Sequence, residues 1–230
     1  MDRDMPAHPP HRRRLWGVGT SRTIRAHWAL AELGLAYETR AIGARTGETK
    51  TAEYTALTAR QKIPLLEDGD LRITESAAII AYLSDTYADA ATALLPRAPV
   101  ERAQCLEWCF FVVSELDATS LYVMRRHRDL GAIYGAAPAV CAAAADYFGQ
   151  QMRSVERALA DGRPYLMGDR FTAADILLSS CLSWAGRYGV PIGEAAATYD
   201  ARVTARPGYE AALSRNAPIM PPAAEGDRTR

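Results

Sequence analysis

The sequence predicts an α/β domain with a mixed four-stranded sheet, followed by an all-α domain. Residues 13–42 read as strand, helix and strand, the order of a parallel βαβ unit with a right-handed crossover. Two β-like runs at 63–67 and 71–74 flank an Asp-Gly pair, which is a strong hairpin signal. Beyond residue 99 the chain is rich in alanine, poor in β-branched residues, and reads as helix almost throughout.

The composition is that of an ordinary globular protein. The chain has 230 residues, 49% of them hydrophobic and 23% charged, which excludes a disordered or low-complexity chain. Its 27 basic and 27 acidic side chains balance, which argues against a dedicated nucleic-acid binder, because phosphate contacts need a basic excess. No apolar stretch approaches the roughly 20 residues of a membrane helix, and none follows the basic N-terminus as in a secretory signal. We therefore expect a cytoplasmic protein that binds neither nucleic acid nor a membrane.

The first domain is expected to span residues 13–88, after a flexible, proline-containing tail at 1–12. A helix at 22–33, with Gly34 placed for its C-cap, is expected between the two parallel strands. A weak helix follows at 53–57, and the hairpin is expected to turn at Asp68-Gly69. A further helix begins at Glu75-Ser76. Helices on both faces of a four-stranded mixed sheet would satisfy this order.

Residues 89–98 read as a linker, and residues 99–230 as the helical domain. One long helix is expected over 99–127 and another over 138–160. The clearest local signal is a capping box in which Thr172 caps a helix and Asp175 reaches back to its amide. Phe171 is placed to pack on Ile176 as a hydrophobic staple, and this helix is expected to continue through residue 184.

Four cysteines, at 105, 109, 141 and 181, lack zinc-like spacing with one another or with histidine. We expect them to be small buried hydrophobic residues, and we find no metal-ligating cluster. The first 104 residues contain no cysteine, so any thiol chemistry in the N-terminal half needs an external thiol.

Five stretches of the chain together resemble the cytosolic glutathione transferases. They are SRTIRAHWALAELGL at 21–35, LTARQKIPLL at 57–66, TESAAI at 74–79, ELD and RH at 115–117 and 126–127, and YLMGDRFTAAD at 165–175. The resemblance covers about residues 13–215. It implies a thioredoxin-like domain followed by an all-helical domain, glutathione as co-substrate without a metal, and a homodimer.

The resemblance also implies a reaction in which the protein lowers the pKa of the glutathione thiol so that the thiolate attacks a small electrophile. A free thiol has a pKa near ~8.5, and a shift of two units needs about 2.7 kcal/mol of preference for the anion. A hydroxyl donor and the positive end of a helix have that capacity.

The activating hydroxyl is expected at Thr20, five residues before the Arg25 that matches the family's arginine. A shift of one residue in the alignment would place it at Ser21 instead. The family's usual residue is Ser, Tyr or Cys, so Thr20 is a departure. A third alternative is that Gly-Thr-Ser serves only as a helix cap. The absence of cysteine here argues against chemistry through a glutathionyl-enzyme intermediate.

Glutathione itself is expected to bind along the edge of the first domain. Lys62 would take the glycine carboxylate, and a cis Ile63–Pro64 bond would leave the Ile63 backbone free to pair with an extended peptide. Glu75 and Ser76 lie at a strand-to-helix junction, where amides and a hydroxyl suit a carboxylate and Glu75 suits an ammonium. The γ-glutamyl end of glutathione carries both groups.

The long helix over 99–127 borders the electrophile pocket in this family. Tyr122, Arg125 and Arg126 are therefore expected to contact the second substrate, and the i,i+4 spacing of Tyr122 and Arg126 puts both on one face.

Two other functions stay open from the sequence. One is a glutathione-dependent peroxidase, disulfide reductase or isomerase. The other is a non-catalytic binding or assembly protein on the same fold. It is considered because position 20 holds neither Ser nor Tyr.

Overall fold

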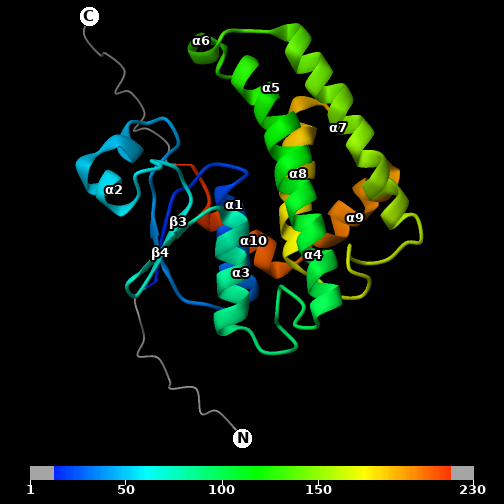
Figure 1. The fold of residues 1–230 in the computed structure, drawn as a ribbon, viewed down its shortest axis with the longest axis horizontal. Coiled ribbons are helices and arrows are strands. Elements are labelled where there is room, and N and C mark those ends of the chain that lie inside the picture. The colour runs from blue at the N-terminus through cyan, green and yellow to red at the C-terminus, as the bar shows by residue number, and fades with distance from the viewer. Residues whose placement is uncertain (1–12, 219–230) are drawn as a thin grey trace, which may run out of the picture.

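The computed structural model describes residues 13–218, which form a sheet domain and a helical domain (Figure 1). The strands are β1 (Arg14–Trp16), β2 (Glu38–Arg40), β3 (Leu65–Asp68) and β4 (Leu71–Thr74). The helices of the sheet domain are α1 (Thr23–Glu32), the short 3-10 helix η1 (Glu48–Lys50), α2 (Ala52–Leu57) and α3 (Ser76–Tyr87). Those of the helical domain are α4 (Pro99–Phe111), η2 (Val112–Leu121), α5 (Tyr122–His127), α6 (Gly131–Tyr134), α7 (Pro138–Leu159), α8 (Ala173–Tyr188), α9 (Glu194–Thr204) and α10 (Pro207–Arg215).

The sheet has the strand order β2-β1-β3-β4. β1 is parallel to β2 and antiparallel to β3, which in turn is antiparallel to β4. α1 and α3 pack on the side that faces the helical domain, whereas α2 lies on the other side of the strands (Figure 1). The predicted fold class, with its parallel βαβ unit, hairpin and all-α second domain, is confirmed.

The hairpin turn lies one residue later than predicted. Asp68 is the last residue of β3 and pairs with Leu71, so the turn consists of Gly69 and Asp70. Asp68 is buried, and its carboxylate accepts hydrogen bonds from the hydroxyls of two tyrosines of α3. These bonds hold Asp68 in the strand. Because the two tyrosines lie 14 and 19 positions later in the chain, the Asp-Gly pair alone does not reveal them.

The long helix predicted after Pro99 changes type along its length. α4 and α5 are α-helical, whereas η2 between them is a π-helix. Asp117 lies within η2, and its carboxylate reaches Arg22 and Arg25 at the start of the sheet domain. π-helical segments frequently occur at functional sites. The sequence pattern predicts only a continuous helix here, because the arginines that pair with Asp117 lie more than 90 positions earlier in the chain.

α8 begins at the predicted capping box. The backbone N–H of Thr172 donates to Asp175 Oδ2 at 2.7 Å. The Asp175 carboxylate also accepts from the Leu166 amide and the Tyr199 hydroxyl, at 2.9 and 2.6 Å. One buried carboxylate thus fixes the start of α8, the loop before it and α9.

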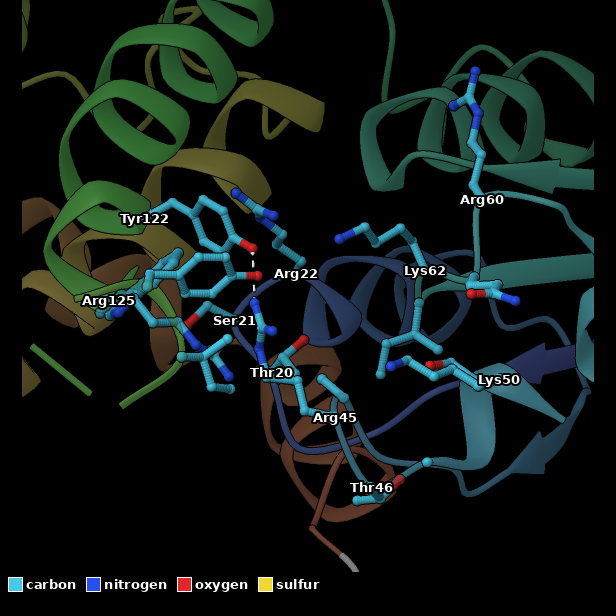
Figure 2. A pocket seen from close by; sticks show the side chains of 18 residues that line it. Thr20, Ser21, Arg22, Arg45, Thr46, Lys50, Arg60, Lys62, Tyr122 and Arg125 are labelled. Carbon is cyan, nitrogen blue, oxygen red and sulfur yellow. Dashed lines mark hydrogen bonds between the residues drawn. The ribbon is translucent and has the colours of Figure 1, made fainter. Parts of the chain in front are cut away.

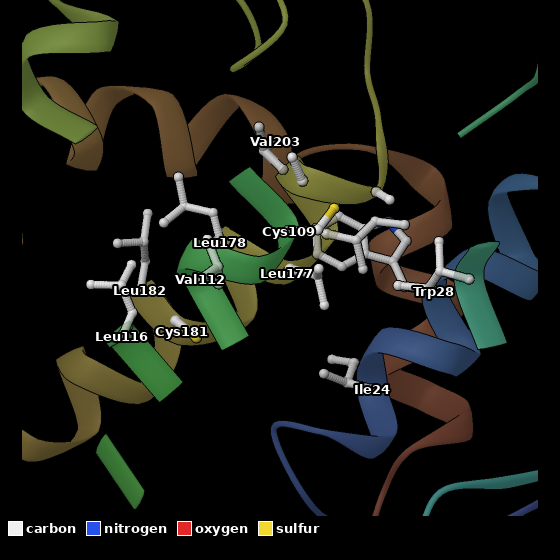
Figure 3. Close-up of a cluster of buried hydrophobic side chains, with 14 of the residues drawn as sticks. Ile24, Trp28, Cys109, Val112, Leu116, Leu177, Leu178, Cys181, Leu182 and Val203 are labelled. Atoms are coloured by element: carbon white, nitrogen blue, oxygen red, sulfur yellow. The ribbon is translucent and has the colours of Figure 1, made fainter. Parts of the chain in front are cut away.

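The two domains share one apolar core (Figure 3). Ile24 and Trp28 of α1 lie beside Leu177 of α8 and Cys109 of α4. Cys105, Cys109 and Cys181 are buried, as predicted, and Cys141 is half-buried. A shared core fixes the orientation of the sheet domain relative to α4–α8, and therefore the shape of the cleft between them.

An ion cluster lies at the edge of this core. Arg22 Nη2 and Arg25 Nη2 are 2.6 and 2.7 Å from the two carboxylate oxygens of Asp117. Arg25 and Asp117 are each only 1% exposed, and Arg25 also donates to the hydroxyl of Ser180 at 2.6 Å. Burial alone would raise the pKa of Asp117, but Arg25 and Arg22 together lower it below its ordinary value.

His27 makes folding sensitive to mild acid. It is fully buried in α1, where its ring bonds the Tyr37 hydroxyl at 2.9 Å and the Gly17 carbonyl at 3.1 Å. Burial lowers its pKa to about 4, so the unfolded chain binds more protons between about pH 6.5 and pH 4. The folded state should therefore lose about 3 kcal/mol as the pH falls across that window.

The variant His27→Gln checks this expectation in urea unfolding at four pH values from 4.5 to 7.5. We expect it to be less stable than the wild type at pH 7.5, with a flatter pH dependence below pH 6.5. Equal pH slopes in the two proteins would mean that other groups cause the acid sensitivity.

Candidate functional site

A cleft of about 680 Å³ lies between the sheet domain and the helical domain (Figure 2). Its walls come from the turn after β1, the segments 44–50 and 60–63, and the helices α5, α6 and α8. Of the predicted site residues it brings together Thr20, Ser21, Lys62, Ile63, Tyr122 and Arg125. Pro64, Glu75, Ser76 and Arg126 lie outside its lining.

The turn between β1 and α1 is organised as a helix cap. The Thr20 hydroxyl accepts the backbone N–H of Thr23 at 3.0 Å, and the Thr20 N–H donates to the Thr23 hydroxyl at 3.0 Å. Such a reciprocal pair satisfies amides that a helix start leaves free. Thr20 thus occupies the capping geometry that the sequence left open as one alternative.

Asn216, which follows α10 near the C-terminal end of the described residues, forms hydrogen bonds to this turn. Its Oδ1 accepts the Thr23 hydroxyl at 2.6 Å, its Nδ2 donates to the Thr20 carbonyl at 3.2 Å, and its carbonyl accepts the Gly19 N–H at 2.9 Å. Thr23 Oγ1 also lies 3.0 Å from the Thr20 carbonyl and 2.9 Å from the Thr20 hydroxyl, and between the two hydroxyls either can be the donor. The Thr20 hydroxyl therefore accepts the Thr23 N–H and has Thr23 Oγ1 within hydrogen-bond distance for its own proton.

Ser21 lies outside this network. Its oxygen accepts a hydrogen bond from Arg187 at the end of α8. Within residues 13–218 its hydroxyl proton has no acceptor, so it is available to a ligand in the cleft. Ser21 also lines a second cavity of about 590 Å³, which shares Thr20, Arg125 and Trp184 with the cleft.

The segment Lys62–Pro64 forms the opposite wall. The Ile63–Pro64 bond is cis, and within the described chain the Ile63 backbone makes no hydrogen bond to the protein. The Tyr54 hydroxyl donates to the Lys62 carbonyl at 2.7 Å, and the Lys62 side chain extends into the cleft towards α5 (Figure 2). Gly17 permits this close approach, since a Cβ there would lie 2.5 Å from Ile63 Cβ and its φ is +111°.

Glu75 and Ser76 lie just beyond the rim of the cleft. Glu75 is in a left-handed conformation with φ of 68°, and its side chain is 70% exposed. Its carboxylate pairs at 3.1 Å with Arg60, whose side chain points away from the other labelled side chains in Figure 2. Ser76 is buried at the first turn of α3. Arg60, which lines the cleft, thus links Glu75 to it.

The helical wall presents Tyr122 and Arg125. The Tyr122 hydroxyl accepts a hydrogen bond from Arg45 at 3.2 Å, and Arg22 stacks on its ring at 4.3 Å. Arg126 is exposed, and its guanidinium lies over the ring of Tyr134, 4.5 Å from the centroid. Tyr122 and Arg125, three residues apart, therefore share the cleft-facing side of α5.

The sequence analysis missed twelve of the 18 residues that line the cleft, among them four cations and three large polar or aromatic side chains. The cations are Arg22, Arg45, Lys50 and Arg60, and the other three are Gln61, Tyr134 and Trp184. Arg45, Lys50 and Tyr134 lie on loops or short helices, where no periodicity indicates which way a side chain points. Arg22 and Arg60 fall inside the stretches at 21–35 and 57–66 that resemble the family, but that resemblance did not indicate their place in the cleft.

No group of three or more His, Cys, Asp or Glu side chains within residues 13–218 is placed to hold a metal ion. None of the helices in that range is both long and apolar enough to cross a lipid bilayer.

Comparison with known proteins identifies the family. The model of the glutathione S-transferase N-terminal domain matches residues 13–85, and that of the C-terminal domain matches residues 138–213. The theta class glutathione S-transferase of Xanthomonas axonopodis pv. citri, solved with glutathione bound, is 32% identical with a TM-score of 0.74. The alignment covers 87% of this chain and 96% of that one. The chain belongs to the glutathione S-transferase family.

Curated relatives within the glutathione S-transferase family agree with this assignment. The glutathione S-transferase GstA of Escherichia coli O157:H7 is 32% identical over 70% of this chain and 77% of its own length. The glutathione S-transferase F10 of Arabidopsis thaliana is 36% identical over 98 residues, so the chain spans only 43% of that relative. The resemblance stated from the sequence and its thioredoxin-like fold are confirmed.

Proposed function

We propose that this protein binds glutathione in the cleft, stabilises its thiolate and directs it at a small electrophile. A new carbon–sulfur bond forms, and the leaving group departs or the electrophile's double bond takes the electron pair. The observation that carries the proposal is the turn before α1, which presents a hydroxyl and the positive end of a helix to the cleft. Glutathione is the only co-substrate that this chemistry requires.

Ser21 is the better candidate for the hydroxyl that donates to the thiolate, with Thr20 as the alternative. The Ser21 proton is unused within residues 13–218, whereas the Thr20 hydroxyl is satisfied by Thr23. The bond from Arg187 occupies an oxygen lone pair of Ser21 and turns its proton away from that guanidinium. Thiolate stabilisation by a hydrogen bond of this kind is worth about 1.5–3 kcal/mol.

The remaining contacts to glutathione follow from the opposite wall. We assign the glycine carboxylate to Lys62 and the peptide backbone to Ile63, next to cis-Pro64. The γ-glutamyl group is assigned to Glu75 and Ser76, beyond Arg60. What supports this is the unpaired Ile63 backbone and the ammonium of Lys62, which extends into the cleft (Figure 2).

A homodimer stays a proposal. Two apolar side chains on α4 face solvent, Val100 at 71% and Phe110 at 64% exposure, and Leu71 of β4 is also exposed. Such residues favour a partner surface. The cytoplasmic location and a role in detoxification stay predictions.

The deciding experiment is a titration of reduced glutathione into the protein, following the ultraviolet band of the thiolate across pH. We expect binding and a thiol pKa about two units below that of free glutathione. Conjugation to 1-chloro-2,4-dinitrobenzene, a neutral electrophile, is measured in parallel. Binding without a pKa shift or turnover would favour the non-catalytic alternative, and a protein active only with peroxides or disulfides would favour the reductase alternative. Absence of binding would refute the proposal.

A further inference from the structure

The cleft carries an excess of positive charge. Among its 18 lining residues are six cations and no aspartate or glutamate. The cations are Arg22, Arg45, Lys50, Arg60, Lys62 and Arg125. A concave surface with charges of one sign concentrates ligands of the opposite sign. The whole chain is neutral, so this excess is a local property of the cleft.

Only two of these cations have a carboxylate partner within the described chain. Arg22 pairs with Asp117 and Arg60 with Glu75. Arg45 bonds a tyrosine hydroxyl, and Lys50, Lys62 and Arg125 have no ion pair within 4.0 Å in residues 13–218. Four positive charges therefore line the cleft without an anionic partner from residues 13–218.

Bound glutathione uses only part of this charge. With its thiol ionised, glutathione carries two carboxylates, one thiolate and one ammonium, which together give a net charge of about −2. The two lysines, on η1 and beside cis-Pro64, belong to the sheet-domain wall that we assign to glutathione. Arg125 projects from α5 on the opposite wall (Figure 2).

Arg125 lies where the cleft meets the second cavity. Both are lined by Arg125, Trp184 and Ser21, so an arginine, a flat aromatic side chain and the candidate thiolate donor border one space. The second cavity has one acidic lining residue, Asp129, which accepts the Tyr188 hydroxyl at 2.5 Å. Arg125 is thus half-buried, close to the expected position of the thiolate, and has no anionic partner among residues 13–218.

We propose that the second substrate is a planar organic electrophile that carries a carboxylate, and that Arg125 binds this carboxylate. The proposal rests on the proposed function and names the substrate class of the same site. An arginine binds a carboxylate through two parallel hydrogen bonds, and Trp184 provides an apolar surface for the ring or double bond beside it. With the carboxylate on Arg125, the electrophilic carbon is directed towards Ser21.

A matched pair of electrophiles tests the proposal: 4-chloro-3,5-dinitrobenzoate and its methyl ester. In both, the glutathione sulfur forms a bond to the ring carbon, the carbon–chlorine bond breaks, chloride leaves, and the thiol proton goes to solvent. Each kcat/KM is divided by the rate constant of the uncatalysed reaction with glutathione, which removes the different intrinsic reactivity of the two rings. We expect the wild type to favour the acid over the ester by about tenfold or more.

The variant Arg125→Gln should remove most of that preference, and Arg125→Lys should keep part of it. Arg153→Gln, which removes an exposed arginine of α7, is the charge control and should keep the wild-type ratio. A wild type that conjugates the ester as well as the acid would overturn the inference while leaving the transferase function intact. Equal losses for both electrophiles in Arg125→Gln would also overturn it. Failure to conjugate either compound or 1-chloro-2,4-dinitrobenzene would refute the proposed function itself.

Discussion

Replacing Asp117 by alanine is expected to lower the free energy of unfolding by about 3–5 kcal/mol. The substitution removes the only carboxylate within residues 13–218 that pairs with Arg25, which is 1% exposed. The guanidinium is left in the shared core with Ser180 and Cys181 as its partners. An uncompensated buried cation costs far more than the attraction of the pair contributes, because the low-dielectric interior cannot replace its hydration. Denaturant unfolding at pH 7 measures the loss.

The control is Asp85→Ala, which removes an exposed carboxylate that pairs with Arg102 at 2.7 Å. An exposed pair contributes about 0–1 kcal/mol, so this variant should unfold nearly as the wild type does. Asp117→Asn keeps the shape and part of the hydrogen bonding, and it serves if the alanine variant does not fold. If Asp117→Ala lowered the free energy of unfolding by no more than Asp85→Ala does, the ion cluster would have no part in holding the domains together.

The pH dependence of stability gives an independent check on Asp117. Because Arg25 and Arg22 lower its pKa in the folded state, its contribution is fully present above the unfolded pKa near ~3.9. It is lost as the pH falls through the lower folded pKa. The wild type should therefore lose stability below about pH 4 more steeply than Asp117→Ala does.

Local signals account for most of the fold that the sequence predicted. The capping box at Thr172 and Asp175 and the C-cap at Gly34 are interactions within a few residues, so their patterns are legible in the sequence. The π-helical form of η2 could not be predicted in this way. Asp117 within it pairs with Arg25, which lies 92 positions earlier in the chain. No window of local sequence contains such a contact.

In the candidate site, too, local motifs predicted some residues, whereas others are placed by contacts between distant parts of the chain. Lys62 and Ile63 fall in a motif that fixes their place on the cleft wall, so they could be predicted before the structure. Asn216 could not, because it touches the turn at Thr20 only after α10 folds back across α1. On α5, spacing alone does not fix rotation about the helix axis, and the structure turns Arg125 rather than Arg126 towards the cleft.

Replacing Ser21 by alanine is expected to lower kcat/KM for 1-chloro-2,4-dinitrobenzene by about 10- to 100-fold near neutral pH. The variant loses the hydrogen bond to the thiolate, worth about 1.5–3 kcal/mol, while the helix N-terminus and the cleft cations remain. The pKa of bound glutathione should rise by about one to two units, which the ultraviolet band of the thiolate reports directly. At a pH well above that raised pKa the thiol is ionised in both proteins, so most of the difference in rate should disappear.

Thr20→Ala separates the hydroxyl that donates to the thiolate from the hydroxyl that caps the helix. Loss of the cap should cost about 1 kcal/mol of stability and leave the thiol pKa close to that of the wild type, because the Thr20 hydroxyl is satisfied by Thr23. The reverse result, a raised thiol pKa in Thr20→Ala and none in Ser21→Ala, would restore the assignment that the alignment alone favours. It would also mean that bound glutathione displaces the Thr20 hydroxyl from Thr23, so that this hydroxyl donates its hydrogen bond to the thiolate instead.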